Sequence, residues 1–97
     1  MRVILLRRAQ RDMLWWRRYY NVVFPEGAEP AFRQFDRIIA LLVTNPRLGR
    51  PVEGFRMRQI SIVNTPYKLI YRVRVDRLEI LRIWDMRQRP SRGFREE

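Results

Sequence analysis

The sequence predicts an α+β fold: an N-terminal strand, an α-helical hairpin and then a three-stranded antiparallel meander. Two observations support it. Apolar residues first recur at intervals of three and four, as in helices, and after residue 54 they alternate with polar residues, as in strands. The chain has 97 residues, enough for one hydrophobic core. We therefore expect one domain over residues 1–97, in which residues 86–97 form a basic C-terminal tail.

The first two elements are a short strand and an aromatic-rich helix. Residues 2–6 form a short apolar run with branched side chains, which predicts the strand. The next apolar positions follow a 4-3-4-3 spacing that places one stripe on a helix: Ala9, Met13, Trp16, Tyr20 and Val23. Three neighbours widen this stripe: Trp15, Tyr19 and Val22. We expect these aromatic residues to pack in a core, although a base-stacking platform is the alternative.

A second helix follows the break "FPEGAEP". Its apolar face is expected to consist of Ala28, Phe32, Phe35, Ile39 and Leu42. Pro30 suits the first turn of a helix, where its missing N–H costs nothing. Asn45 ends the helix because the residue before a proline avoids helical geometry. The two helices should form an antiparallel hairpin that buries its apolar side against a sheet.

Three strands are expected at 56–63, 67–75 and 78–85. With a turn at Asp76 and Arg77, one sheet face is nearly all apolar: Leu69, Tyr71, Val73, Val75, Leu78, Ile80 and Trp84. The other face mixes apolar and charged residues: Lys68, Ile70, Arg72, Arg74, Glu79, Leu81, Ile83 and Asp85. We expect the first face to meet the helices and the second to be an exposed partner site. The alternative is that the tail covers the second face.

The net charge of +11 comes from 20 arginines and one lysine against 10 acidic residues. Such a charge implies an acidic partner, either nucleic acid or an acidic protein segment. High-GC codon usage is an alternative explanation for the preference for arginine. The absence of cysteine excludes disulfides and favours a cytoplasmic location, and no apolar run is long enough for a membrane span. Without histidine, cysteine or a glycine-rich loop, we expect no metal and no cofactor.

The element order and three segments carry a resemblance to a known superfamily. These segments are "NPRLGRPVEGFR", "YKLIYRV" and "LEILRIWDMRQRP", within residues 45–90. Together they resemble the RelE/ParE superfamily, the toxins of type II toxin–antitoxin modules. The resemblance implies a cognate antitoxin with an acidic segment that folds on the toxin, and operator DNA bound indirectly through the antitoxin complex. No membrane partner is implied.

The resemblance leaves two activities open. RelE-like members are ribosome-dependent endonucleases that cleave messenger RNA, and ParE-like members bind DNA gyrase. For a ribonuclease, the available cations would be Arg58, Lys68, Arg72, Arg82 and Arg87. The groups left for proton transfer would be Tyr67, Tyr71, Glu53 and Asp85.

We favour no catalytic residue, because the chain has no histidine and arginine is a poor base. The ending "WDMRQRP" also looks more like that of ParE proteins than that of the ribonucleases. The sequence therefore favours a ParE-like gyrase inhibitor, with a ribonuclease second and a generic nucleic-acid-binding module third.

Partner contacts follow from the expected second sheet face and from the C-terminal exit. The residues expected to bind the antitoxin are Ile70, Arg72, Arg74, Leu81 and Ile83. The residues expected to bind the target are Trp84, Arg87, Arg89 and Arg92. A core role is the alternative for Trp84, and a solvated tail is the alternative for Arg89 and Arg92.

Overall fold

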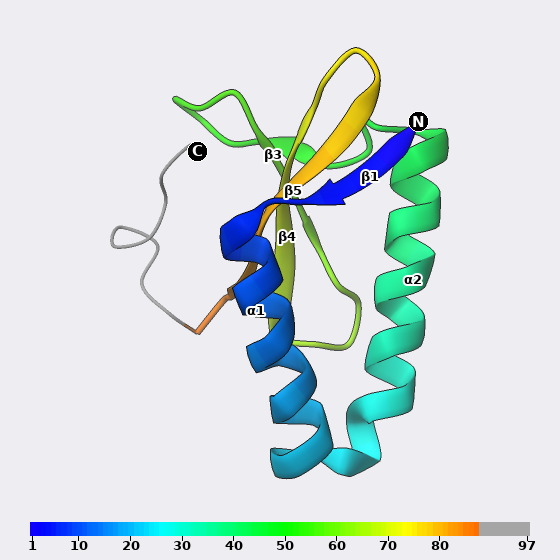
Figure 1. The fold of residues 1–97 in the computed structure, drawn as a ribbon, viewed down its shortest axis with the longest axis vertical. Helices are drawn as coiled ribbons and strands as arrows, with labels where there is room; N and C mark the ends of the chain where they lie inside the picture. Colours follow the sequence, from blue (N-terminus) through cyan, green and yellow to red (C-terminus); the bar gives the residue numbers. More distant parts are fainter. Residues whose placement is uncertain (88–97) are drawn as a thin grey trace.

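The computed structural model describes residues 1–87 and confirms the α+β class. Two antiparallel helices joined by a short connection pack against a twisted sheet (Figure 1). In chain order the elements are β1 (Arg2–Leu5), α1 (Arg7–Arg18), α2 (Ala28–Thr44), β2 (Arg50–Pro51), β3 (Arg58–Ser61), β4 (Tyr67–Val73) and β5 (Arg77–Asp85). A π-helical segment, Tyr19–Val23, and a short 3-10 turn, Pro25–Gly27, connect the helices. Within residues 1–87, no helix has the length and apolar character to cross a membrane.

The sheet has the strand order β1-β5-β4-β3-β2. The meander of β3, β4 and β5 is antiparallel, as expected, and β1 pairs with β5 in parallel. The sequence did not reveal β2, a two-residue edge strand whose second residue is Pro51. So short a segment has no alternation to detect, and proline is depleted in strands.

The main core lies between the helices and the sheet, as the apolar stripes predict. Trp16 is its centre and is only 2% exposed. Four aromatic rings lie with centroids 5.2–6.2 Å from that of Trp16: Tyr20, Phe32, Phe35 and Tyr67. Edge-on and tilted contacts of this kind add about 0.5–1.5 kcal/mol per pair beyond the area buried. The aromatic residues that belong to this cluster are therefore structural.

The second sheet face is not an exposed strip, which corrects the expectation from strand alternation. Ile70 and Leu81 are each 1% exposed and pack with Met57 and Trp84. Val52, in the loop between β2 and β3, and Leu6, just after β1, also cover this cluster. The sheet consequently has an apolar layer on both faces.

The pairing of β4 with β5 also differs from the expected register. Arg74 N donates to Arg77 O at 2.8 Å, so the turn contains Val75 and Asp76. Further along, Ile80 pairs with Tyr71 and Arg82 pairs with Ile70, which leaves Leu81 as an extra residue in β5. Such a bulge reverses the alternation beyond it.

Two residues of β5 change faces as a result of this bulge. Ile83 packs in the core on the helix side, and Trp84 packs in the cluster on the other face. The sequence had placed each of them on the opposite face. Their exchange follows from the one extra residue, because successive side chains of a strand point to opposite faces.

Candidate functional site

A cleft of about 610 Å³ opens beside β3 and the end of β4. Its lining residues are Arg47, Pro51, Phe55, Arg56, Met57, Arg58, Arg72, Val73, Arg74 and Val75. We call this surface the arginine cleft, because half of these residues are arginines and none is acidic. These side chains come from β2 and the loops on either side of it, from the start of β3, and from the end of β4 with the turn that follows. The arrangement suits the binding of an anion.

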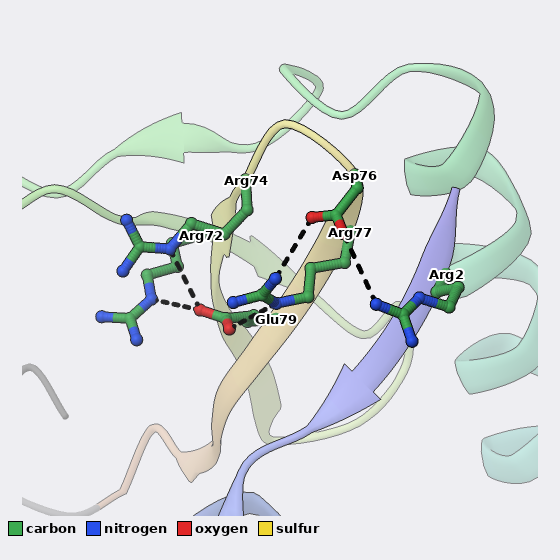
Figure 2. A network of polar contacts seen from close by, with 6 residues as sticks. All are labelled: Arg2, Arg72, Arg74, Asp76, Arg77 and Glu79. Atoms are coloured by element: carbon green, nitrogen blue, oxygen red, sulfur yellow. Dashed lines mark hydrogen bonds and ion pairs between the residues drawn. The ribbon is translucent and has the colours of Figure 1, made fainter.

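One buried carboxylate organises the arginines at the end of β4. Glu79, on β5, is 5% exposed and accepts hydrogen bonds from Arg72, Arg74 and Arg77 (Figure 2). The N–O distances are 2.5 Å to Arg72, 3.3 Å to Arg74 and 2.9 Å to Arg77. Asp76 extends the network to Arg2 of β1. Three arginines share one buried carboxylate, so the region remains positive.

The charge of Glu79 is strongly favoured in this environment. The hydrogen bond from Arg72 has the largest effect and lowers the pKa of Glu79. Burial opposes this effect, but the hydrogen bond from Arg77 lowers the pKa further, and the pKa falls to about 2. The Arg77 guanidinium has its pKa raised in turn by its hydrogen bond to Glu79. Glu79 is therefore ionised at neutral pH, and its ion pairs hold β4, β5 and the rim of the arginine cleft together.

The structure does not bring the five candidate nuclease cations together. Arg58 and Arg72 line the arginine cleft, but Arg58 Nη1 donates to the backbone oxygens of Arg47 and Gly49, and Arg72 binds Glu79. Lys68 lies in a different hollow and donates to Gln59 Oε1 at 2.7 Å. Each of these cations supports local structure.

The other two cations lie in a groove between α1 and β5, with a volume of about 410 Å³. Arg82 Nε donates to Asp12 Oδ2 at 2.7 Å, and the same oxygen accepts from the Ile83 N–H at 2.9 Å. Asp12 thereby fastens α1 to the edge of β5 beyond the end of β1. Arg87 forms a two-point ion pair with Asp85, at 2.9 and 2.8 Å. Arg82 therefore ties α1 to β5, whereas the ion pair of Arg87 is local to the end of β5.

Three of the four groups expected to transfer protons have a pKa that the fold shifts away from neutrality. Burial raises the pKa of Tyr67 and of Tyr71, so both phenols are neutral at physiological pH. The Tyr71 hydroxyl donates to Pro46 O and accepts from Gly49 N, which makes it a structural link. The hydrogen bond from Arg87 lowers the pKa of Asp85, and Glu53 is exposed in the loop after β2. The pKa shifts of Tyr67, Tyr71 and Asp85 all lead away from neutrality, where a general acid or base works best.

The residues expected to bind an antitoxin or a target are divided by the structure. Ile83 and Trp84 are each 4% exposed, so, like Ile70 and Leu81, they are not available on the surface of the free chain. Arg72 and Arg74 remain beside the arginine cleft, and the side chain of Arg74 is 49% exposed. Arg89 and Arg92 lie outside the described residues. Antitoxin and target contacts at these positions stay predictions.

Helix α1 carries an exposed apolar surface, which includes Trp15, a residue that the sequence assigned to the core. Leu14 and Trp15 are each 70% exposed, and together with Arg11 and Arg18 they line a hollow of about 270 Å³. The guanidinium of Arg18 lies 5.9 Å from the centre of the Trp15 ring. We call these four residues the α1 ridge. A large exposed apolar side chain among cations is typical of a protein-binding surface.

Within residues 1–87, no group of three or more acidic, histidine or cysteine residues could hold a metal ion. We take two surfaces as the candidate site, the arginine cleft and the α1 ridge.

A family model for the ParE toxin of the ParDE type II toxin–antitoxin system matches residues 3–90. The chain belongs to the ParE toxin family. A solved structure described as a chromosomal ParDE toxin–antitoxin system from P. aeruginosa is 28% identical to this ParE-family chain. The likeness covers 86% of this chain and 92% of that one, with a TM-score of 0.67.

A second structure, a YoeB/ParE toxin from Agrobacterium tumefaciens, has the same fold as this ParE-family toxin. Its identity is 18%, its TM-score is 0.64, and 86% of this chain and 95% of that one are covered. No curated protein sequence matches the chain significantly. The type II toxin identity and the superfamily fold expected from residues 45–90 are thus confirmed.

The sequence reasoning missed three residues of this ParE-family toxin that line the arginine cleft: Arg47, Phe55 and Arg56. All three lie in loops next to the two-residue strand β2. The available signal was the density of arginines between residues 47 and 58, in a segment rich in glycine and proline. Such a loop can gather charges that no periodic pattern reveals.

Proposed function

We propose that this ParE-family toxin inhibits growth by binding DNA gyrase and that it does not cleave messenger RNA. The observation that carries the proposal is the state of the five cations a ribonuclease would need: Arg58, Lys68, Arg72, Arg82 and Arg87. They are spread over three separate hollows, and each is engaged with a carboxylate, a carbonyl or an amide oxygen of the chain itself. A phosphorane transition state needs cations that converge on one point.

Gyrase is proposed as the target because the chain belongs to the ParE family. The resemblance of its sequence to ParE-like toxins implies the same target. Trp84 is buried, so Arg87, at the last described position, is the exposed target contact among the described residues. Its side chain is 56% exposed and is held over the Tyr19 ring at 5.5 Å by the ion pair with Asp85. Arg89 and Arg92 follow it in the sequence and extend the same proposed contact.

A cognate acidic antitoxin is the second proposed partner, and the α1 ridge is its proposed docking surface. The ridge offers two exposed apolar side chains, Leu14 and Trp15, between the cations Arg11 and Arg18. An acidic amphipathic segment could bury its apolar side on this surface and place carboxylates near both arginines. Operator DNA would be reached through the antitoxin of the complex.

The test is a gyrase supercoiling assay with purified toxin, repeated with increasing amounts of antitoxin. We expect the toxin to inhibit supercoiling and equimolar antitoxin to restore it. Trp15→Glu places a carboxylate on the α1 ridge, so this variant should require about tenfold more antitoxin for the same relief. Leu41→Glu is the matched control, because Leu41 is an exposed apolar residue of α2.

Two results would contradict this proposal separately. Unimpaired supercoiling at a large excess of folded toxin would remove gyrase as the target. Equal antitoxin requirements for Trp15→Glu and Leu41→Glu would remove the α1 ridge as the docking surface and leave the target untouched.

A further inference from the structure

The one lysine of the chain lies where the fold disfavours a positive charge. Lys68 stands beside 20 arginines in the sequence. Its half-buried side chain, on β4, lines a hollow of about 190 Å³ to which Leu48, Ile60 and Met86 add apolar surface. Burial lowers the pKa of the Lys68 ammonium, and the neighbouring Arg50 guanidinium lowers it further. Both effects favour the neutral amine.

A lysine at this position has a chemical consequence that an arginine would not have. Arginine keeps its proton at every physiological pH, whereas a desolvated lysine beside another cation releases its proton more readily and becomes a nucleophile. Lys68 Nζ donates a hydrogen bond to Gln59 Oε1 at 2.7 Å, which ties the amine to β3. The hollow therefore contains a positioned amine whose charged form is destabilised.

The same hollow has a cation that suits a small anion. Arg50 is exposed, and its guanidinium group has no hydrogen bond or ion pair with any residue between 1 and 87. Among the described residues that line the hollow, none is acidic. A guanidinium group binds phosphate well. The hollow is smaller than the roughly 300–1,000 Å³ typical of pockets for larger ligands, so it fits a small molecule.

These two groups together select one class of ligand, the acyl phosphates. An acyl phosphate joins an electrophilic carbonyl carbon to an anionic phosphate through a single oxygen atom. This arrangement matches an amine and a guanidinium group that line one small hollow. An uncharged ester would make no use of Arg50, and an unreactive anion, such as inorganic phosphate or a nucleic-acid strand, would make no use of a neutral amine.

We propose that Lys68 is an acylation site of this toxin, at which a small acyl phosphate transfers its acyl group to Nζ. The lone pair of Nζ forms the new N–C bond, and the C–O bond to the phosphate breaks. The phosphate leaves with that electron pair and with the proton that the nitrogen releases, and Arg50 binds the phosphate throughout. The product amide has lost the charge of Lys68. This modification goes beyond the gyrase-directed function proposed above.

The first experiment compares Lys68 with an ordinary lysine in the same molecule. Arg37→Lys introduces that lysine at an exposed position of α2. The variant is incubated with acetyl phosphate at neutral pH, and mass spectrometry of chymotryptic peptides gives the acetylation rate of each lysine. We expect Lys68 to react about tenfold faster, because a larger fraction of its amine is neutral. An equal or lower rate at Lys68 would overturn the proposed site.

The second experiment tests whether Arg50 recognises the phosphate. Arg50→Gln should slow the acetylation of Lys68 by acetyl phosphate about tenfold. It should slow acetylation by the uncharged N-hydroxysuccinimidyl acetate only about twofold, because that reagent loses only the effect of Arg50 on the amine. Equal slowing with the two reagents would overturn the assignment to acyl phosphates.

The matched control for Arg50→Gln is Arg17→Gln, which removes the same charge from an exposed position of α1. We expect this control to change either rate by less than about twofold, because salt screens a distant surface charge. Equal effects of the two variants on the reaction with acetyl phosphate would overturn the role given to Arg50 and indicate general charge attraction.

Discussion

Replacing Glu79 by glutamine is expected to lower the free energy of unfolding by about 3 kcal/mol at neutral pH. The glutamine keeps the size of the side chain but removes the charge that Arg72, Arg74 and Arg77 share. Arg72 is the most affected, because its side chain is only 13% exposed and water can replace little of the lost interaction. Urea denaturation monitored by tryptophan fluorescence measures the change.

The effect of Glu79→Gln should depend on pH. The pKa of Glu79 is about 2 in the folded chain against an ordinary value of 4.5, so the folded chain binds fewer protons than the unfolded chain between these values. The stabilisation is therefore complete above about pH 4.5 and is lost as the pH falls toward 2. The variant lacks this titration, so the difference between the two proteins should narrow over the same window.

Glu29→Gln is the control for Glu79→Gln. Glu29 pairs with Arg33 one turn further along α2, and both side chains are exposed, so its loss should cost less than about 0.5 kcal/mol. Similar destabilisation by the two variants, or a difference at Glu79 that is independent of pH, would contradict the role given to the network.

The adjacent tryptophans of α1 should respond very differently to replacement by alanine. Trp16→Ala is expected to cost about 3 kcal/mol, at the lower end of the range for large-to-small core changes. The lower end applies because the buried Trp16 indole N–H has no hydrogen-bond partner among residues 1–87, so its removal also relieves a desolvation penalty. Trp15→Ala should stay within about 0.5 kcal/mol, because the side chain is 70% exposed.

Thermal and urea unfolding of the two alanine variants measure this contrast, and each variant serves as the control for the other. The difference holds even if Trp16→Ala fails to fold, provided that Trp15→Ala unfolds like the unmodified chain. A comparable loss in both variants would show that the face of α1 has been assigned wrongly.

The two tryptophans also mark a limit of sequence reasoning. Helical periodicity placed both near the apolar stripe, since neighbours on a helix are about 100° apart and a wide stripe can include each. The actual boundary depends on where β5 and α2 meet α1, which is a property of the whole fold. The helices, the N-terminal strand and the meander could be predicted because their patterns are local.

The prediction for the second sheet face was wrong for a related reason. Segment 78–84 reads LEILRIW, with apolar residues at five of its seven positions, so it fits two alternations equally well. The extra residue Leu81 selects between them, and nothing in the sequence marks it as a bulge. Likewise, the loop that brings Val52 and Met57 over Ile70 has no periodic signal. Coverage of a sheet by a loop is decided by tertiary packing.

The most direct test of the central claim, that this toxin acts without cleaving RNA, is to map the 5′ ends of transcripts during translation. Purified toxin is added to translating ribosomes, and the transcripts are analysed by primer extension. We expect the same ends with and without toxin, because the candidate cations are dispersed and engaged in structural contacts. New toxin-dependent ends that disappear with Arg58→Ala or Lys68→Ala would contradict the account.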